Sequence, residues 1–107
     1  MVVTHRHIEQ IQALSQLKSF ARASRKLNIS QPALSRSISS LEEQLGVKLF
    51  DRKHNNVTPT LFGKYILKKG EYLLQELKLL NRDLRLLGDN QSGEIHIGCG
   101  PFPAEMF

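Results

Sequence analysis

Hydrophobic positions in the first third of the chain recur every three or four residues, which predicts successive amphipathic helices. The first repeat indicates a helix over about residues 5–18, and the second indicates a shorter helix over residues 20–27. Thr4 and Ser19 precede these segments and are suited to cap them. The predicted inward faces consist of Ile8, Ile11 and Leu14 in the first helix and of Phe20, Ala23 and Leu27 in the second.

A third helix is predicted between Ser30, its N-cap, and Gly46, which ends it. Pro32 is compatible with a helix start, because the amides of the first turn have no intrahelical partners. Apolar side chains occupy one narrow arc of this helix, and the opposite side is short and polar. The inward arc contains Leu34, Ile38, Leu41 and Leu45, and the outward side contains Pro32, Arg36, Ser39 and Glu43, with Gln31 and Ser35 on its flank.

After Gly46 the pattern changes to two short extended segments, over residues 47–52 and 57–58. The four residues between Arg52 and Val57 favour a turn, so the segments form a β-hairpin, or wing. Arg52 and Lys53 border its tip and are suited to contact a phosphate or a narrow minor groove.

A long helix follows, predicted over residues 61–87 with Thr60, or Thr58 before Pro59, as cap and Gly88 as its end. At ~1.5 Å per residue it is about 40 Å long, too long for a small head to cover its apolar face. An uncovered face of this kind favours self-association, so we expect a dimer. The predicted dimerisation stripe is Ile66, Leu73, Leu77, Leu80, Leu84 and Leu87, beside a second stripe of Tyr65, Tyr72, Leu79 and Leu86.

The last segment of the chain looks like the start of another domain. Residues 89–93 are typical of a hinge, and residues 94–98 alternate like a β-strand. Because a strand without partners is not stable, we expect the sequence to be a piece of a longer protein.

Charge is distributed unevenly along the chain. Residues 1–60 contain nine Lys and Arg against four Asp and Glu, whereas residues 61–107 contain six of each. The whole net charge of +5 therefore belongs to the first 60 residues. This asymmetry indicates a polyanionic partner for that half of the chain, although charge that only maintains solubility would look the same.

Two helices joined by a tight turn, the second with a polar outward end, predict a helix-turn-helix. Such a second helix enters the DNA major groove and brings its first residues to the base edges. Gln31 and Arg36 can donate to purine edges, and Pro32 can contact a thymine methyl. Ser30 and Ser35 can hold a phosphate. The predicted DNA-binding set is Ser30, Gln31, Pro32, Ser35, Arg36, Ser39, Arg52 and Lys53.

Residues 4–98 resemble the DNA-binding part of the LysR-type transcriptional regulators. The resemblance rests on Ser19-Phe20 with Ala23, the run from Leu27 to Ser35, Ile38, Leu41-Glu42, Leu45-Gly46, Leu49 to Arg52, Thr60 with Gly63, and Gly93 to Gly98. It implies DNA contact by Gln31, Pro32, Ser35, Arg36 and Arg52.

The resemblance also implies an antiparallel linker-helix dimer, or a tetramer of the intact protein, on a pseudo-palindromic double-stranded operator. A small-molecule effector would bind a C-terminal domain that this sequence lacks. The predicted fold is mainly α: a winged helix-turn-helix head (residues 1–60), a linker and dimerisation helix (61–88), and a hinge with the truncated start of the effector-binding domain (89–107). We expect a cytoplasmic regulator of transcription.

Other kinds of function find little support. His5 and His7 diverge on a helix, so neither they nor the single Cys99 predict a metal site, and no cofactor is expected in this part of the protein. Glu42 and Glu43 do not face one point, which argues against an enzyme. No apolar run reaches the ~20 residues of a membrane helix. The alternative is a protein–protein interaction and dimerisation module without a specific DNA site. The operator, the effector, the target genes and the direction of regulation do not follow from the sequence.

Overall fold

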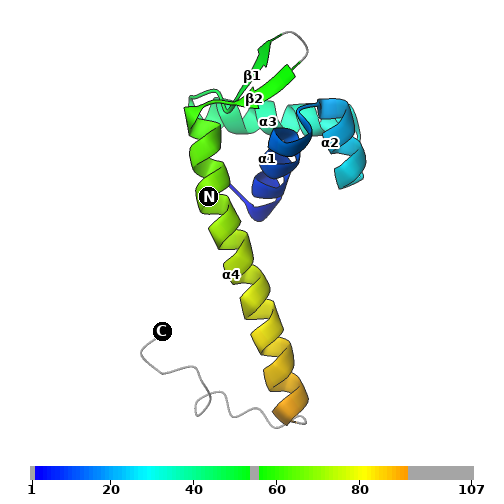
Figure 1. The fold of residues 1–107 in the computed structure, drawn as a ribbon, viewed down its shortest axis with the longest axis vertical. Coiled ribbons are helices and arrows are strands. Elements are labelled where there is room, and N and C mark those ends of the chain that lie inside the picture. Colours follow the sequence, from blue (N-terminus) through cyan, green and yellow to red (C-terminus); the bar gives the residue numbers. More distant parts are fainter. Residues whose placement is uncertain (1, 54–55, 92–107) are drawn as a thin grey trace. The chain divides into compact units, whose positions relative to one another are not determined.

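The computed structural model describes residues 2–53 and 56–91 of the chain, and they divide between two compact units, Met1–Leu74 and Gln75–Phe107. We call the first unit the head. The described residues form a mainly α fold with a small antiparallel hairpin, as the sequence predicts. The elements are α1 (His5–Leu17), α2 (Phe20–Leu27), α3 (Gln31–Leu45), β1 (Phe50–Lys53), β2 (Asn56–Pro59) and α4 (Leu61–Gln91) (Figure 1).

The start of α1 is fixed by a capping box in which both side chains take part. The Thr4 hydroxyl accepts from the His7 amide at 3.4 Å, and Nδ1 of His7 accepts from the Thr4 amide at 3.0 Å. Burial lowers the pKa of His7, which favours the neutral ring that can accept this bond. The helix ends one residue earlier than predicted, because Lys18 adopts a left-handed conformation with φ 57°.

Serine caps begin the next two helices where the sequence predicts them. The Ser19 hydroxyl accepts from the Arg22 amide at 3.2 Å, and the Ser30 hydroxyl accepts from the Ala33 amide at 3.1 Å. Gly46 ends α3 with φ 75°, a conformation that costs glycine little. Local sequence therefore sets the lengths of α2 and α3.

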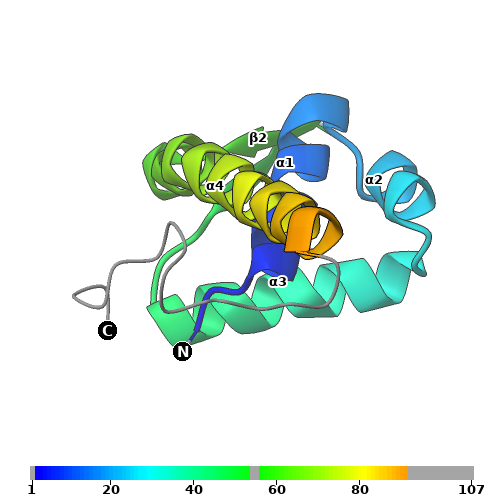
Figure 2. The same cartoon turned by 90° about the horizontal axis from the view of Figure 1, so that it is seen from below.

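The core of the head lies where α1, α2 and α3 meet the hairpin, and α1 lies between α3 and the first turns of α4 (Figure 2). Leu45 was predicted to face this core, but it is 36% exposed, so that prediction is wrong. Leu45 is the last residue of α3, and the buried contacts of this turn are made by Leu41 and Glu42 instead. The buried apolar residues are Ile8, Ile11, Ala13, Leu14, Ala23, Leu34, Ile38, Leu41, Leu49, Phe50 and Val57.

The first strand of the wing is shorter than the predicted segment 47–52, and the second strand, Asn56–Pro59, is longer than the predicted segment 57–58. The first strand begins at Phe50 rather than at residue 47, because the preceding residues turn to meet α3 and α4. The strands pair with Phe50 opposite Pro59 and Arg52 opposite Val57, and the hairpin extends beyond α3 in Figure 1. Val57 is buried and joins the wing to the core. Residues 54 and 55 of the predicted tip lie outside the described residues.

Helix α4 begins at its predicted cap, since the Gly63 amide donates to the Thr60 hydroxyl at 3.3 Å. It does not end at Gly88 as predicted but continues to Gln91, so residues 89–91 of the predicted hinge are helical. A single glycine costs a helix only about 1 kcal/mol relative to alanine, too little to end it without further signals. The predicted strand 94–98 and Cys99 lie outside the described residues.

Two glycines allow α4 to approach the rest of the head closely. A Cβ on Gly70 would come within 2.5 Å of a methyl carbon of Ile8, and a Cβ on Gly63 would overlap the carbonyl oxygen of Leu49. The first turns of α4 therefore pack against α1 and the segment before β1 as part of the head. None of the helices in the described part of the chain combines the length and apolar character of a membrane span.

Candidate nucleic-acid interface

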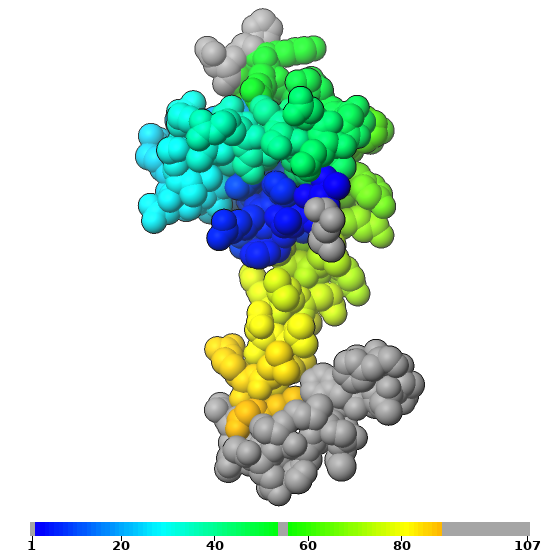
Figure 3. Space-filling model, turned by 180° about the vertical axis from the view of Figure 1, so that it is seen from behind, coloured from blue at the N-terminus to red at the C-terminus, as the bar shows by residue number. Residues whose placement is uncertain are grey.

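The outer face of α3 lies open on the head, as its cyan-to-green surface shows in Figure 3. Gln31, Pro32, Arg36 and Ser39 are exposed, and Ser35 is half-buried. Ser30 is exposed too, but its oxygen already accepts the capping bond. The structure thus brings together the six residues of α3 and its cap that the sequence selected, on the side of the helix away from its buried leucines.

The opposite face of α3 holds the helix in place. Leu34, Ile38 and Leu41 are almost completely buried, at 0%, 0% and 1% exposure. The Ser37 hydroxyl donates to the side-chain oxygen of Gln10 at 2.6 Å, which ties the middle of α3 to α1. Because one face is anchored so firmly, the outer face can meet a ligand without rotation of the helix.

Glu42 provides a polar anchor at the edge of the buried face. It is only 5% exposed, and its Oε2 accepts from the amides of Leu49 at 2.7 Å and Phe50 at 3.3 Å. Its other oxygen lies 4.0 Å from the Lys48 ammonium, at the limit of an ion pair. The sequence predicted no structural role for Glu42, which appeared there in the family resemblance and as half of a carboxylate pair. Its place four residues after Ile38, on the inward arc, is the signal that would have found it.

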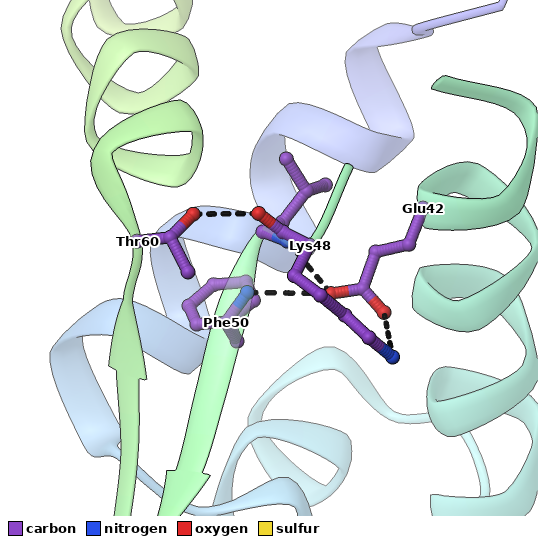
Figure 4. A network of polar contacts seen from close by, with 5 residues as sticks. Glu42, Lys48, Phe50 and Thr60 are labelled. Carbon is purple, nitrogen blue, oxygen red and sulfur yellow. Dashed lines mark hydrogen bonds and ion pairs between the residues drawn. The ribbon is translucent and has the colours of Figure 1, made fainter. Parts of the chain in front are cut away.

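Thr60 holds the same segment from the other side, as Figure 4 shows. Its hydroxyl donates to the carbonyl oxygen of Lys48 at 2.6 Å, and its amide donates to the carbonyl oxygen of Leu49 at 2.9 Å. The segment that leads into β1 is therefore fixed between α3 and the start of α4. This arrangement sets where the wing stands relative to the outer face of α3.

The two basic residues predicted for the wing have different surroundings. Both Arg52 and Lys53 are exposed. The guanidinium carbon of Arg52 lies 4.5 Å from the centre of the Phe20 ring, at the start of α2. Cation–π contacts form within about 6 Å, so this guanidinium is held in position by the ring.

Further positive charge lies on α2 and was missing from the predicted set. Arg22, Arg25 and Lys26 are exposed on this helix, and the Lys26 ammonium donates to the side chain of Gln16 at 2.9 Å. In a helix-turn-helix the first helix crosses the DNA backbone, so these residues belong among candidates for phosphate contact. Their clustering on one short helix was visible in the sequence.

The described residues contain no group of three or more His, Cys, Asp and Glu side chains placed to hold a metal ion. His7 instead serves the cap of α1.

The predicted dimerisation stripe divides between the two units. Ile66 is half-buried and packs against the head core, so the structure removes it from the exposed stripe. Leu87, near the end of α4, is half-buried. The residues that remain exposed are Leu73, Leu77, Leu80 and Leu84.

Known protein families and sequences include close counterparts of this head. Residues 5–64 match the family model described as "Bacterial regulatory helix-turn-helix protein, lysR family". A transcriptional activation protein for SDS degradation from a Pseudomonas species is 40% identical over 98 residues, which cover 92% of this chain and 32% of that protein. The dual regulator OxyR of Escherichia coli K12 is 35% identical, over 90% of this chain and 32% of its own length.

Solved structures agree with this comparison. The DNA-binding domain of BenM, in complex with benA site 1 DNA, matches with a TM-score of 0.75 and 31% identity, over 80% of this chain and 97% of that one. Vibrio fischeri DarR in complex with DNA matches with a TM-score of 0.76 and 29% identity, over 83% of this chain and 30% of that one. The chain spans about a third of the length of the curated relatives. It belongs to the lysR family of bacterial regulatory helix-turn-helix proteins.

Proposed function

We propose that this chain is the DNA-binding part of a sequence-specific transcriptional regulator. The observation that carries the proposal is the outer face of α3, which is polar and exposed in its first turns. The opposite face of the helix is anchored by the buried side chains of Leu34, Ile38 and Leu41. A helix of this construction fits the major groove, where donors on its first turns reach base edges. The similar BenM domain and DarR were both solved in complex with DNA, which supports the same role here.

The predicted contacts have distinct tasks. Gln31 and Arg36 would read purine edges, and Pro32 would contact a thymine methyl. Ser35 and Ser39 would lie beside the groove, and Lys53 would contact the phosphate backbone. Ser30 can still donate its hydroxyl proton to a phosphate while its oxygen caps α3. This chemistry is regulatory and needs no catalytic group.

The exposed part of α4 fits a dimer of this chain. Leu77, Leu80 and Leu84 recur at three- and four-residue spacing and are 41%, 47% and 49% exposed. A two-fold dimer would cover them and would present two α3 helices to a pseudo-palindromic site. The whole protein would then act in the cytoplasm and take a small-molecule effector in a further domain, with tetramers as a second level of assembly.

Selection of genomic fragments by the purified chain, followed by titration of one selected duplex and its shuffled counterpart, tests the proposal. We expect the selected duplex to bind at least about tenfold more tightly. We also expect affinity to fall by on the order of a hundredfold between about 50 and 200 mM salt, because bound phosphates release counterions. Failure to bind any selected duplex more tightly than its shuffled counterpart would favour the alternative, a protein–protein interaction and dimerisation module without a specific DNA site.

A further inference from the structure

Arg52 lies on the side of the wing that faces the head. In an antiparallel pair, directly opposed side chains share one face of the hairpin, and Arg52 is opposite Val57. Val57 is buried in the head core. Lys53, the next residue on β1, therefore points to the other face. The two basic residues of the wing occupy different surfaces, although they are adjacent in the sequence.

The ring of Phe20 receives the guanidinium of Arg52 on this inner face. The guanidinium carbon is 4.5 Å from the ring centre, within the range of a cation–π contact. Phe20 itself is half-buried, packs against the core and is the first residue of α2. The contact therefore joins the wing to the helix that precedes α3, through a ring that is itself held firmly.

A stacked guanidinium can still bind an anion. Its N–H groups lie in the plane of the group, so one side can cover the ring while the edge donates two parallel bonds to a phosphate. Arg52 is exposed, which leaves that edge accessible to solvent. Long side chains lose rotamer freedom when they bind, and a side chain already held in place loses less.

We infer that Phe20 is a positioning residue for DNA binding: its ring orients Arg52 between the wing and α2, so that the guanidinium meets a backbone phosphate without further ordering. This inference rests on the proposed function. It differs from a purely structural role for Phe20, in which the ring would only fill space beside the core.

The test is a double-mutant cycle on the full chain, with affinity for a selected duplex as the readout. Phe20→Leu removes the ring but keeps an apolar side chain, and Phe20→Tyr keeps the ring. We expect Phe20→Leu to weaken binding about 3- to 10-fold and Phe20→Tyr to stay within about twofold of the original chain. In a chain that already carries Arg52→Gln, Phe20→Leu should have no further effect.

The salt dependence of binding gives a second readout, which loss of packing alone would not change. We expect Phe20→Leu to reduce its slope towards that of Arg52→Gln, because one phosphate contact is weakened. Equal losses from Phe20→Leu in both backgrounds, or a loss with Phe20→Tyr as large as with Phe20→Leu, would overturn the inference. Thermal unfolding of each variant shows whether its head is folded.

If Phe20→Leu does not fold, Phe20→Met answers the same question, because methionine keeps an unbranched apolar side chain but has no ring beneath the guanidinium. A loss of about threefold or more supports the inference, and unchanged affinity overturns it. If the original chain binds no duplex in a salt-dependent way, the proposed function fails together with the inference. If the chain binds DNA but the effects of Phe20→Leu and Arg52→Gln on affinity are additive, the inference is overturned and the proposed function stands.

Discussion

Helix α3 and the later turns of α4 contain the same leucine pattern in opposite environments. In both, apolar residues recur at three- and four-residue intervals, which marks one face for burial. In α3 that face is covered by the chain itself, whereas at Leu77, Leu80 and Leu84 it is open. The buried set is Leu34, Ile38 and Leu41, at 0%, 0% and 1% exposure, and the open set is Leu77, Leu80 and Leu84, at 41%, 47% and 49%.

Hydrophobic spacing alone does not specify which surface buries a helix face. The spacing determines which face of the helix is apolar, but the residues that cover this face come from the tertiary or quaternary structure. The 74-residue head supplies that surface for α3, through α1, α2 and the wing. For the later part of α4, the surface we propose is a second copy of the chain.

The largest expected effect is on stability, when one leucine of each helix face is truncated to alanine. Leu41→Ala should destabilise the head by about 2–5 kcal/mol, because it leaves a cavity in a closed core. Leu80→Ala should change the stability of the head by no more than about 0.5 kcal/mol, since that side chain is already exposed. Urea unfolding at several protein concentrations separates folding from association. Equal losses for both variants would contradict the comparison.

The next effect concerns association. Leu77→Lys combined with Leu84→Lys should weaken self-association at least about a hundredfold, roughly 2.7 kcal/mol, because buried charge would oppose the dimer. Sedimentation velocity at protein concentrations on the order of tens of micromolar measures the fraction of dimer. The heads should remain folded but bind an operator more weakly, because each then binds singly. The idea fails if the original chain sediments as a monomer or the variant as a dimer.

A smaller loss of stability is expected at the inner face of α3. Glu42→Ala should cost about 1–3 kcal/mol, because the amides of Leu49 and Phe50 lose their buried acceptor. Its exposed neighbour gives the matched control, and Glu43→Ala should cost no more than about 0.5 kcal/mol. Thermal and urea unfolding provide the measurements. If the two variants are equally stable, the carboxylate does not anchor the segment before β1.

The last pair of effects concerns the outer face of α3 and the wing, alters DNA binding and leaves folding intact. Arg36→Ala should weaken a specific site by about 1–3 kcal/mol if it reads a guanine. Lys53→Ala should weaken cognate and random duplexes about equally and lower the salt slope by roughly one. Competition titrations with both duplexes distinguish the two. Should Arg36→Ala weaken both duplexes to the same extent, Arg36 contacts the backbone rather than a base.

Local signals predicted the secondary structure well. Thr4, Ser19, Ser30 and Thr60 each cap the helix that the sequence assigned to them, because a cap depends on residues within one turn. The predicted end of α4 was wrong, because a glycine such as Gly88 ends a helix only when the residues after it adopt a turn. The family and the fold class predicted from the sequence are confirmed.

Contacts between distant residues could not be predicted in this way. Nothing in the spacing places Arg52 over Phe20, because the two are 32 positions apart and meet only after the wing folds against α2. The hydrogen bonds that Glu42 accepts from the amides of Leu49 and Phe50 likewise depend on how the chain turns after α3. The DNA-binding and dimerisation residues stay predictions, because their partners are other molecules.

The position of Thr60 has a mechanical consequence. One side chain caps α4 through the Gly63 amide and also holds the carbonyl of Lys48 at the entrance to the wing. A torque applied to the first turn of α4 would reach the segment before β1 through these two bonds of Thr60, to Lys48 and Leu49, as well as through the peptide chain from β2. We therefore expect rotation of this turn to be coupled to movement of the wing.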